Sequence, residues 1–159
     1  MISNTCSGKM SWLWRVFALL SLAWALFVLW GCLNETGASG GLIVRLFPFL
    51  KGFAYLDKLV HAGLHGVLAS LLWWTGVMRA RAAVGSHPAT AAQAAPWSMR
   101  HALAIVLFCA AYGGVIELLQ AGFTTTRGAE WLDELANTTG ATLAVLFWQS
   151  LRYCFIQKR

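Results

Sequence analysis

The chain has 159 residues, of which 58% are hydrophobic and only 11% are charged. Soluble domains carry about 25% charged residues, so much of this surface must face something other than water, and lipid is the simplest candidate. The net charge of +6 does not indicate nucleic-acid binding, because the basic residues flank apolar runs instead of forming a stripe with interleaved aromatics.

The four cysteines lie far apart in the sequence and form no Cys-x-x-Cys pair. Neither a disulfide framework nor a cysteine metal site is therefore expected. The length of the chain predicts a single domain over residues 1–159.

The first predicted element is a transmembrane helix over about residues 12–33. Residues 16–33 contain no charged side chain, and about 20 helical residues cross a bilayer core. A cleaved signal peptide is the alternative, since Lys9 and Arg15 precede the run. The apolar run is longer than the usual signal core of about 7–15 residues, and Trp30 fits a cleavage site poorly, so a helix is favoured.

A glycine-rich connection follows, and it contains a short apolar run over residues 42–50. Nine residues are too few to cross a membrane. With Pro48 inside the run and Arg45 and Lys51 beside it, the run predicts a segment that lies in the membrane interface.

Three further transmembrane helices are predicted over about residues 56–78, 102–121 and 132–153. Residues 79–100 hold two prolines and are expected to form a polar loop. The expected fold is therefore all-α, a four-helix transmembrane bundle with a short interfacial segment between helices 1 and 2.

Small residues recur four apart in two of these helices, at Ala62 and Gly66 and at Gly140 and Ala144. This spacing is typical of close contact between membrane helices. Trp73 and Trp74, near the far end of the second helix, are expected to lie in an aromatic belt at the membrane surface.

Charge predicts the orientation of the bundle. Four spans place the N-terminus, residues 79–100 and the C-terminus on one side with eight Lys and Arg, against four on the other side. All six acidic residues fall on or near that second side. The positive-inside rule then puts both termini in the cytoplasm and the acidic residues at the outer face of the cell membrane.

Polar residues gather near the outer ends of the second, third and fourth helices. Residues four apart share a helix face, which pairs Asp57 with His61 and Asp133 with Asn137. If these faces converge with that of Glu117, one polar pocket opens outward. The candidate ligand-binding residues are Asp57, Lys58, Gln120, Arg127 and Asn137, and the candidate catalytic residues are His61, Glu117 and Asp133.

Each candidate role has a simpler structural alternative. Arg127 and Lys58 can hold an anion, since guanidinium binds phosphate through two hydrogen bonds, or Arg127 can form an ion pair that locks two helix ends. His61 can exchange a proton near neutral pH, or it can hold the third helix through Glu117. Gln120 and Asn137 can satisfy buried backbone groups or each other.

A metal site is also conceivable, because His61 and His65 are four apart and Glu117 or Asp133 can supply a third ligand. A single His-x3-His pair is common by chance, so no metal and no other cofactor is expected.

Three motifs together resemble the VanZ-like membrane proteins: Asp-Lys-x-x-His at 57–61, Glu-x-x-Gln at 117–120, and Arg-x5-Asp-x3-Asn-x2-Gly at 127–140. They cover about the last two thirds of the chain. His65 stands where the family often has an aromatic, and Thr125-Thr126 replace a Pro-Gly pair. The resemblance implies that the polar residues of these motifs, Gly140 included, form the family's site, and it links the chain to glycopeptide (teicoplanin-type) resistance.

Three functions are compatible with these patterns. The first is binding of an anionic amphipathic or lipid-linked envelope molecule at the outer face. The second is an enzyme, a hydrolase or transferase acting on a lipid-linked precursor. The third is a structural or accessory subunit in which the polar residues only hold the helices together.

Overall fold

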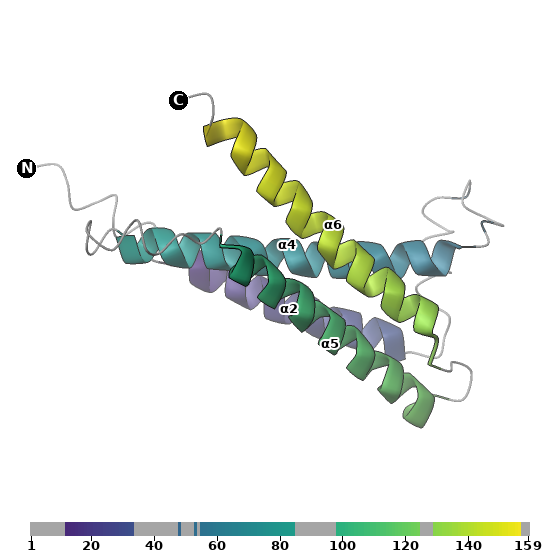
Figure 1. Cartoon of the computed structure of the whole chain (residues 1–159). Helices are drawn as coiled ribbons and strands as arrows, with labels where there is room; N and C mark the ends of the chain where they lie inside the picture. The colour runs from purple at the N-terminus through teal and green to yellow at the C-terminus, as the bar shows by residue number, and fades with distance from the viewer. Residues whose placement is uncertain are drawn as a thin grey trace, which may run out of the picture.

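The computed structural model describes residues 12–33, 48, 53, 55–84, 98–124 and 129–156, with backbone alone at 84 and 152–156. These residues form four α-helices and no strand, as predicted: α2 Leu13–Leu33, α4 Leu56–Val84, α5 Met99–Phe123 and α6 Trp131–Ile156. Successive helices run in opposite directions (Figure 1), so α2 and α5 end where α4 and α6 begin. We call the end where α2 and α5 finish and α4 and α6 begin the polar end of the bundle. The opposite end is called the aromatic end.

The loop predicted over residues 79–100 is too long at both ends, because residues 79–84 belong to α4 and residues 99–100 belong to α5. Helix α4 continues to Val84, because its last residues are rich in alanine and arginine and Arg81 lies in the final turn, which favours the helix dipole. Helix α5 begins at Met99, where the Ser98 side chain accepts a hydrogen bond from the His101 backbone N–H, a standard N-cap. The predicted interfacial segment lies outside the described residues, apart from Pro48.

Helix α4 makes its most extensive contacts with α6, and the two cross in Figure 1. Gly140 of α6 lies against the backbone of Ala62, and a β-carbon at position 140 would overlap the Ala62 carbonyl oxygen. A β-carbon added at Gly66 would lie 3.3 Å from the Gly140 carbonyl oxygen. The predicted small-residue contact is therefore confirmed, and it brings the two backbones together.

Helix α2 is attached to the other helices through side-chain hydrogen bonds to backbone carbonyls. Trp24 Nε1 donates to the Leu64 carbonyl oxygen at 3.0 Å, and the Tyr112 hydroxyl donates to that of Ala25 at 2.5 Å. These bonds tie α2 to α4 and α5 in the interior of the bundle.

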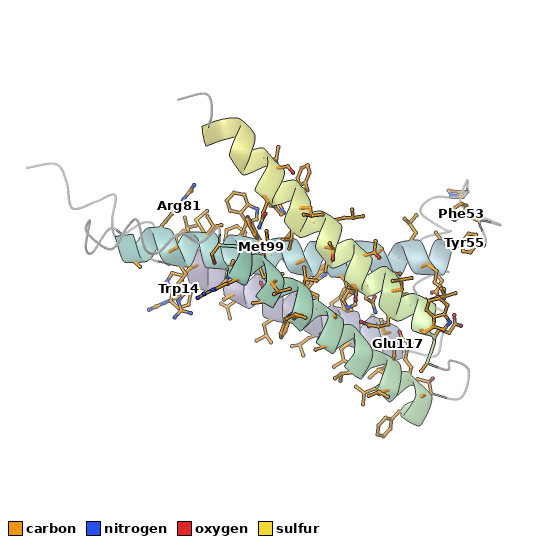
Figure 2. The ribbon with its side chains drawn as sticks, viewed as in Figure 1. Trp14, Phe53, Tyr55, Arg81, Met99 and Glu117 are labelled. Carbon is orange, nitrogen blue, oxygen red and sulfur yellow. The ribbon has the colours of Figure 1, made fainter. Side chains whose placement is uncertain are left out.

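Trp73 is 1% exposed and packs in the core, so its assignment to an aromatic belt was wrong. Figure 2 shows side chains spreading outward along the whole bundle, with Trp14 and Arg81 toward one end and Phe53 and Tyr55 at the other. Many of the outward side chains are large and apolar, such as Leu22, Leu118 and Leu143. Two helices, α2 and α5, are long and apolar enough to cross a membrane.

Candidate functional site

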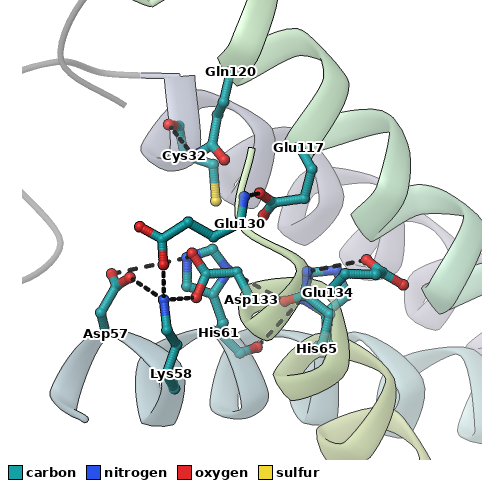
Figure 3. Close-up of polar contacts among 11 residues, drawn as sticks. Cys32, Asp57, Lys58, His61, His65, Glu117, Gln120, Glu130, Asp133 and Glu134 are labelled. Atoms are coloured by element: carbon teal, nitrogen blue, oxygen red, sulfur yellow. Dashed lines mark hydrogen bonds and ion pairs between the residues drawn. The ribbon is translucent and has the colours of Figure 1, made fainter. Parts of the chain in front are cut away.

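The polar residues of α4 and α6 meet because the crossing point lies next to them. Ala62 follows His61 directly, and Gly140 lies about one helical turn after Asn137. The backbone contact between Ala62 and Gly140 therefore holds the first two turns of both helices side by side. The predicted convergence of these two faces is observed at the polar end (Figure 3).

Lys58 lies at the centre of an ion network. Its Nζ is 2.6 Å from Glu130 Oε2 and 3.5 Å from Asp57 Oδ2, and it also contacts Asp133 Oδ1. The side chain of Asp133 is only 8% exposed, whereas that of Glu130 is 59% exposed. A carboxylate as buried as Asp133 needs a partner, and Lys58 provides one.

His61 is almost completely buried, and its two ring nitrogens have different surroundings. Nδ1 lies 3.2 Å from Asn137 Oδ1. Nε2 lies 3.8 Å from Asp57 Oδ1 and 3.8 Å from Asp133 Oδ2. Glu117 was the predicted structural partner of His61, but the described hydrogen bond of the ring is with Asn137 of α6.

Asn137, with no exposed surface, orients the ring of His61. Its Nδ2 donates to Glu134 Oε2 at 3.5 Å, which leaves Oδ1 facing the histidine. An amide oxygen only accepts hydrogen bonds, so a hydrogen bond here requires His61 Nδ1 to be the donor. The other ring nitrogen, Nε2, then faces the two aspartates.

Glu117, which is 5% exposed, joins α5 to the start of α6. Its Oε2 accepts a hydrogen bond from the Glu130 backbone N–H at 2.8 Å, while its Oε1 has no hydrogen-bond partner among the described residues. Glu130 immediately precedes α6, and a carboxylate at a helix N-terminus is favourable for the helix dipole.

Two other predicted or considered residues, Gln120 and His65, do not join this cluster. Gln120 Nε2 donates to the Cys32 carbonyl oxygen at 2.9 Å, so Gln120 connects α5 to the last turn of α2. His65 is buried, and its Nδ1 lies 3.3 Å from the His61 carbonyl oxygen instead of facing the carboxylates. Arg127 lies outside the described residues.

The structure adds two acidic residues that sequence analysis did not single out as site residues, Glu130 and Glu134. Glu130 contacts Lys58, and Glu134 accepts hydrogen bonds from Asn137 and from Thr138 Oγ1. Their positions beside Asp133 at the start of a helix were the available signal. We call the following residues the polar cluster: Asp57, Lys58, His61, Glu117, Glu130, Asp133, Glu134 and Asn137.

The described part of the polar cluster is strongly acidic. It combines five carboxyl groups with one lysine and one histidine. Such an arrangement can bind a cation, or it can assist proton transfer through a histidine flanked by carboxylates. An anionic ligand requires additional positive charge at this end.

No protein-family model, curated protein or solved structure matches the chain. A functional assignment therefore depends on the residues and geometry of the chain itself.

Proposed function

We propose that the chain is a VanZ-like integral membrane protein whose polar end binds the headgroup of an anionic amphipathic or lipid-linked envelope molecule. The observation that carries this proposal is the gathering of charged side chains in a partly buried cluster at one end of a largely apolar bundle. Ionised groups near lipid are costly, by about 2.5–3.5 kcal/mol at a bilayer centre on insertion scales. Residues with such a cost commonly serve a function.

The proposal includes four membrane crossings. Besides α2 and α5, residues 59–78 of α4 and 135–151 of α6 lack Asp, Glu, Lys and Arg. With a rise of about 1.5 Å per residue, stretches of this length approach the thickness of a bilayer core, about 30 Å. The antiparallel order of the helices and the apolar side chains on their outer faces support the same arrangement.

We further propose that the polar end faces outward and that both termini are cytoplasmic. The described basic residues that lack an acidic partner in the bundle, Arg15, Arg79, Arg81 and Arg100, belong to the aromatic end. This asymmetry agrees with the positive-inside rule. A phosphate-bearing lipid or lipid-linked precursor of the outer leaflet could then reach the polar cluster from the membrane.

In this proposal Arg127 and Lys58 contribute positive charge for the anion, while Asp57, Glu117 and Asp133 position them. The resemblance to VanZ-like proteins extends the proposal to teicoplanin-type resistance. Expression of the chain in a sensitive host, followed by measurement of the inhibitory concentration of teicoplanin, tests that extension.

A second candidate function is catalysis on the same lipid-linked molecule by hydrolysis or transfer. The position of His61 favours it: Asn137 orients the ring, and two aspartates lie beside the other nitrogen. A histidine held in one tautomer next to carboxylates is a common general base. His61→Gln would then keep the ligand bound but leave it unprocessed.

The binding proposal is tested by mass spectrometry of lipids that co-purify with the gently solubilised protein. Wild type is compared with Arg127→Ala and with Arg81→Ala, an exposed arginine at the opposite end, and thermal stability is recorded for all three. We expect a phosphate-bearing lipid in wild type and Arg81→Ala that is lost from Arg127→Ala at equal stability. Absence of a specific lipid, with an Arg127→Ala protein that melts much earlier, would leave Arg127 as a scaffold residue.

A further inference from the structure

One carboxylate oxygen from each of two aspartates faces His61 Nε2. Because Nδ1 of the ring lies against Asn137 Oδ1, Nε2 is directed at Asp57 Oδ1 and Asp133 Oδ2. Both distances, 3.8 Å, are too long for a hydrogen bond.

The spacing of these three atoms suits a metal ion. One nitrogen or oxygen from each of Asp57, His61 and Asp133 lies within 4.8 Å of the others. Ligands held about 2.0–2.2 Å from a shared ion stand about 3.3–3.8 Å from one another in tetrahedral or trigonal geometry. The separations from Nε2 lie at the upper edge of that range.

The lysine does not occupy this position. Lys58 contacts Oδ2 of Asp57 and Oδ1 of Asp133, whereas the oxygens that face His61 are Oδ1 of Asp57 and Oδ2 of Asp133. Each aspartate therefore uses one oxygen toward the lysine and the other toward the histidine (Figure 3). Lys58 therefore orients the two carboxylates through the oxygens that do not face the ring.

The residues that hold His61 in place are also of the kind that surrounds metal ligands in proteins. A metal-bound histidine nearly always donates its other N–H to an oxygen that fixes its ring. Asn137 supplies that oxygen, and Glu134 in turn holds Asn137. The side chain of His61 is 3% exposed and that of Asp57 is 44% exposed, so solvent reaches the three ligands from the side of Asp57. An ion has a path of entry there.

We propose that Asp57, His61 and Asp133 bind one divalent transition-metal ion, of the Zn²⁺ or Mn²⁺ class, at the polar end. One imidazole nitrogen and two carboxylate oxygens, with no thiolate, suit these ions. Three protein ligands leave at least one coordination position for water or a ligand oxygen. This site differs from the His61–His65 pair considered from the sequence, because His65 faces away from the carboxylates.

A bound cation would resolve the charge problem of the polar cluster. Among the described residues, five carboxyl groups beside one lysine repel an anionic headgroup, and a divalent ion offsets two of those charges while offering a phosphate oxygen an open position. This role in ligand binding rests on the proposed function. Metal binding by the protein alone does not, so the two can fail separately.

The test uses the full chain, purified in detergent without a polyhistidine tag and stripped with EDTA. Zn²⁺ and Mn²⁺ are titrated separately by calorimetry, and metal content is measured after desalting. We expect one equivalent of at least one of these ions to bind wild type, with affinity reduced at least 100-fold in His61→Gln. Loss of the supporting oxygen in Asn137→Ala should reduce affinity about 10- to 100-fold.

His101→Gln is the matched control, since His101 lies at the aromatic end, and it should bind the metal as wild type does. Asp57→Asn provides a second ligand variant that is safe for folding, because this side chain is half-exposed, and it should weaken binding at least 10-fold. Fewer than about 0.1 equivalents of either metal on wild type would overturn the proposal. Equal binding by wild type and by folded His61→Gln or Asp57→Asn would also overturn it.

Repeating the lipid co-purification on EDTA-stripped protein separates the two proposals. Metal binding without any enriched lipid would support the metal site and count against the proposed function. Lipid enriched equally with and without metal, in a protein that binds neither ion, would overturn the metal site and leave the proposed function intact.

Discussion

The two ends of the α4–α6 pair are held together in different ways. At the polar end, Lys58, His61 and Asn137 each contact particular atoms of the facing helix, and Gly140 touches the backbone of Ala62. At the aromatic end, Trp148 and Trp74 pack edge to face with ring centroids 5.1 Å apart, and a single hydrogen bond joins Trp148 Nε1 to Ser70 Oγ at 3.0 Å.

The difference lies in how much each contact depends on exact atoms. Removing the partner of a buried carboxylate or imidazole lowers the stability of the folded protein. An aromatic contact, in contrast, tolerates replacement by a ring of similar size. Substitutions at the polar end should therefore be costly and specific, and those at the aromatic end should be mild.

The largest effect is expected at the crossing point. In Gly140→Ala the new β-carbon overlaps the Ala62 carbonyl oxygen, and backbone cannot move aside as a side chain does. We expect a loss of about 3 kcal/mol in the free energy of unfolding, at the top of the usual range for overpacking. Unfolding of the detergent-solubilised protein, followed by circular dichroism, measures it.

Gly63→Ala is the control for this substitution, because a β-carbon there meets nothing within 4 Å. It should be neutral or stabilising by up to about 1 kcal/mol, since alanine favours helix over glycine. Similar melting of the two variants would show that the crossing is looser than described.

The next effect is loss of the lysine. Lys58→Met leaves Asp133 buried beside Glu130 and Asp57 without its cation. Breaking a buried ion pair costs about 3–5 kcal/mol, and partial exposure of Lys58 reduces our expectation to about 2 kcal/mol. A double-mutant cycle with Asp133→Asn checks the cause: the double variant should be more stable than Lys58→Met, and simple additivity would argue against the pair.

A smaller loss is expected when the support of His61 is removed. Asn137→Ala leaves His61 Nδ1 and Glu134 Oε2 without this partner in a site that has no exposed surface. An unsatisfied buried group costs about 1–3 kcal/mol, and we expect about 1.5 kcal/mol. The neighbouring exposed Thr139→Ala should change the melting temperature little. Equal effects from both substitutions would place Asn137 outside the network.

The smallest effect is expected at the aromatic end. Trp148→Phe removes the hydrogen bond to Ser70 but keeps a ring against Trp74. Hydrogen bonds between membrane helices average about 0.6 kcal/mol, and a loss of about that size is expected. Ser70→Ala should cost the same, and combining the two should add nothing. A loss above about 2 kcal/mol in the free energy of unfolding would show that contacts at the aromatic end are as sensitive to substitution as those at the polar end.

Much of the fold followed from the sequence, because uncharged runs and small residues four apart carry direct physical meaning. The four helices, the contact at Gly140 and the meeting of Asp57, His61, Asp133 and Asn137 were all predicted in outline. Helix ends were harder, as α4 shows: an alanine-rich stretch with prolines beyond it allows helix or loop, and local propensity extends the helix to Val84.

Other features could not be predicted, because they depend on which helix lies opposite. Gln120 satisfies a carbonyl of α2, Trp73 enters the core and Lys58 pairs with Glu130, all contacts between residues far apart in the chain. The partition of aspartate oxygens between Lys58 and His61 is likewise a matter of atomic geometry. Residue types and spacing predict a shared face, but they do not specify individual atoms.

The account depends most on the chain crossing the membrane four times with its polar end outside. Met99 and Trp131 are each 74% exposed and begin α5 and α6 at opposite ends of the bundle. The direct measurement is labelling of Met99→Cys and Trp131→Cys, each in a cysteine-free background, with a membrane-impermeant maleimide on intact cells. We predict labelling of position 131 in intact cells and of position 99 only after lysis. Labelling of both positions from the same side, or of position 99 alone from outside, would contradict the account.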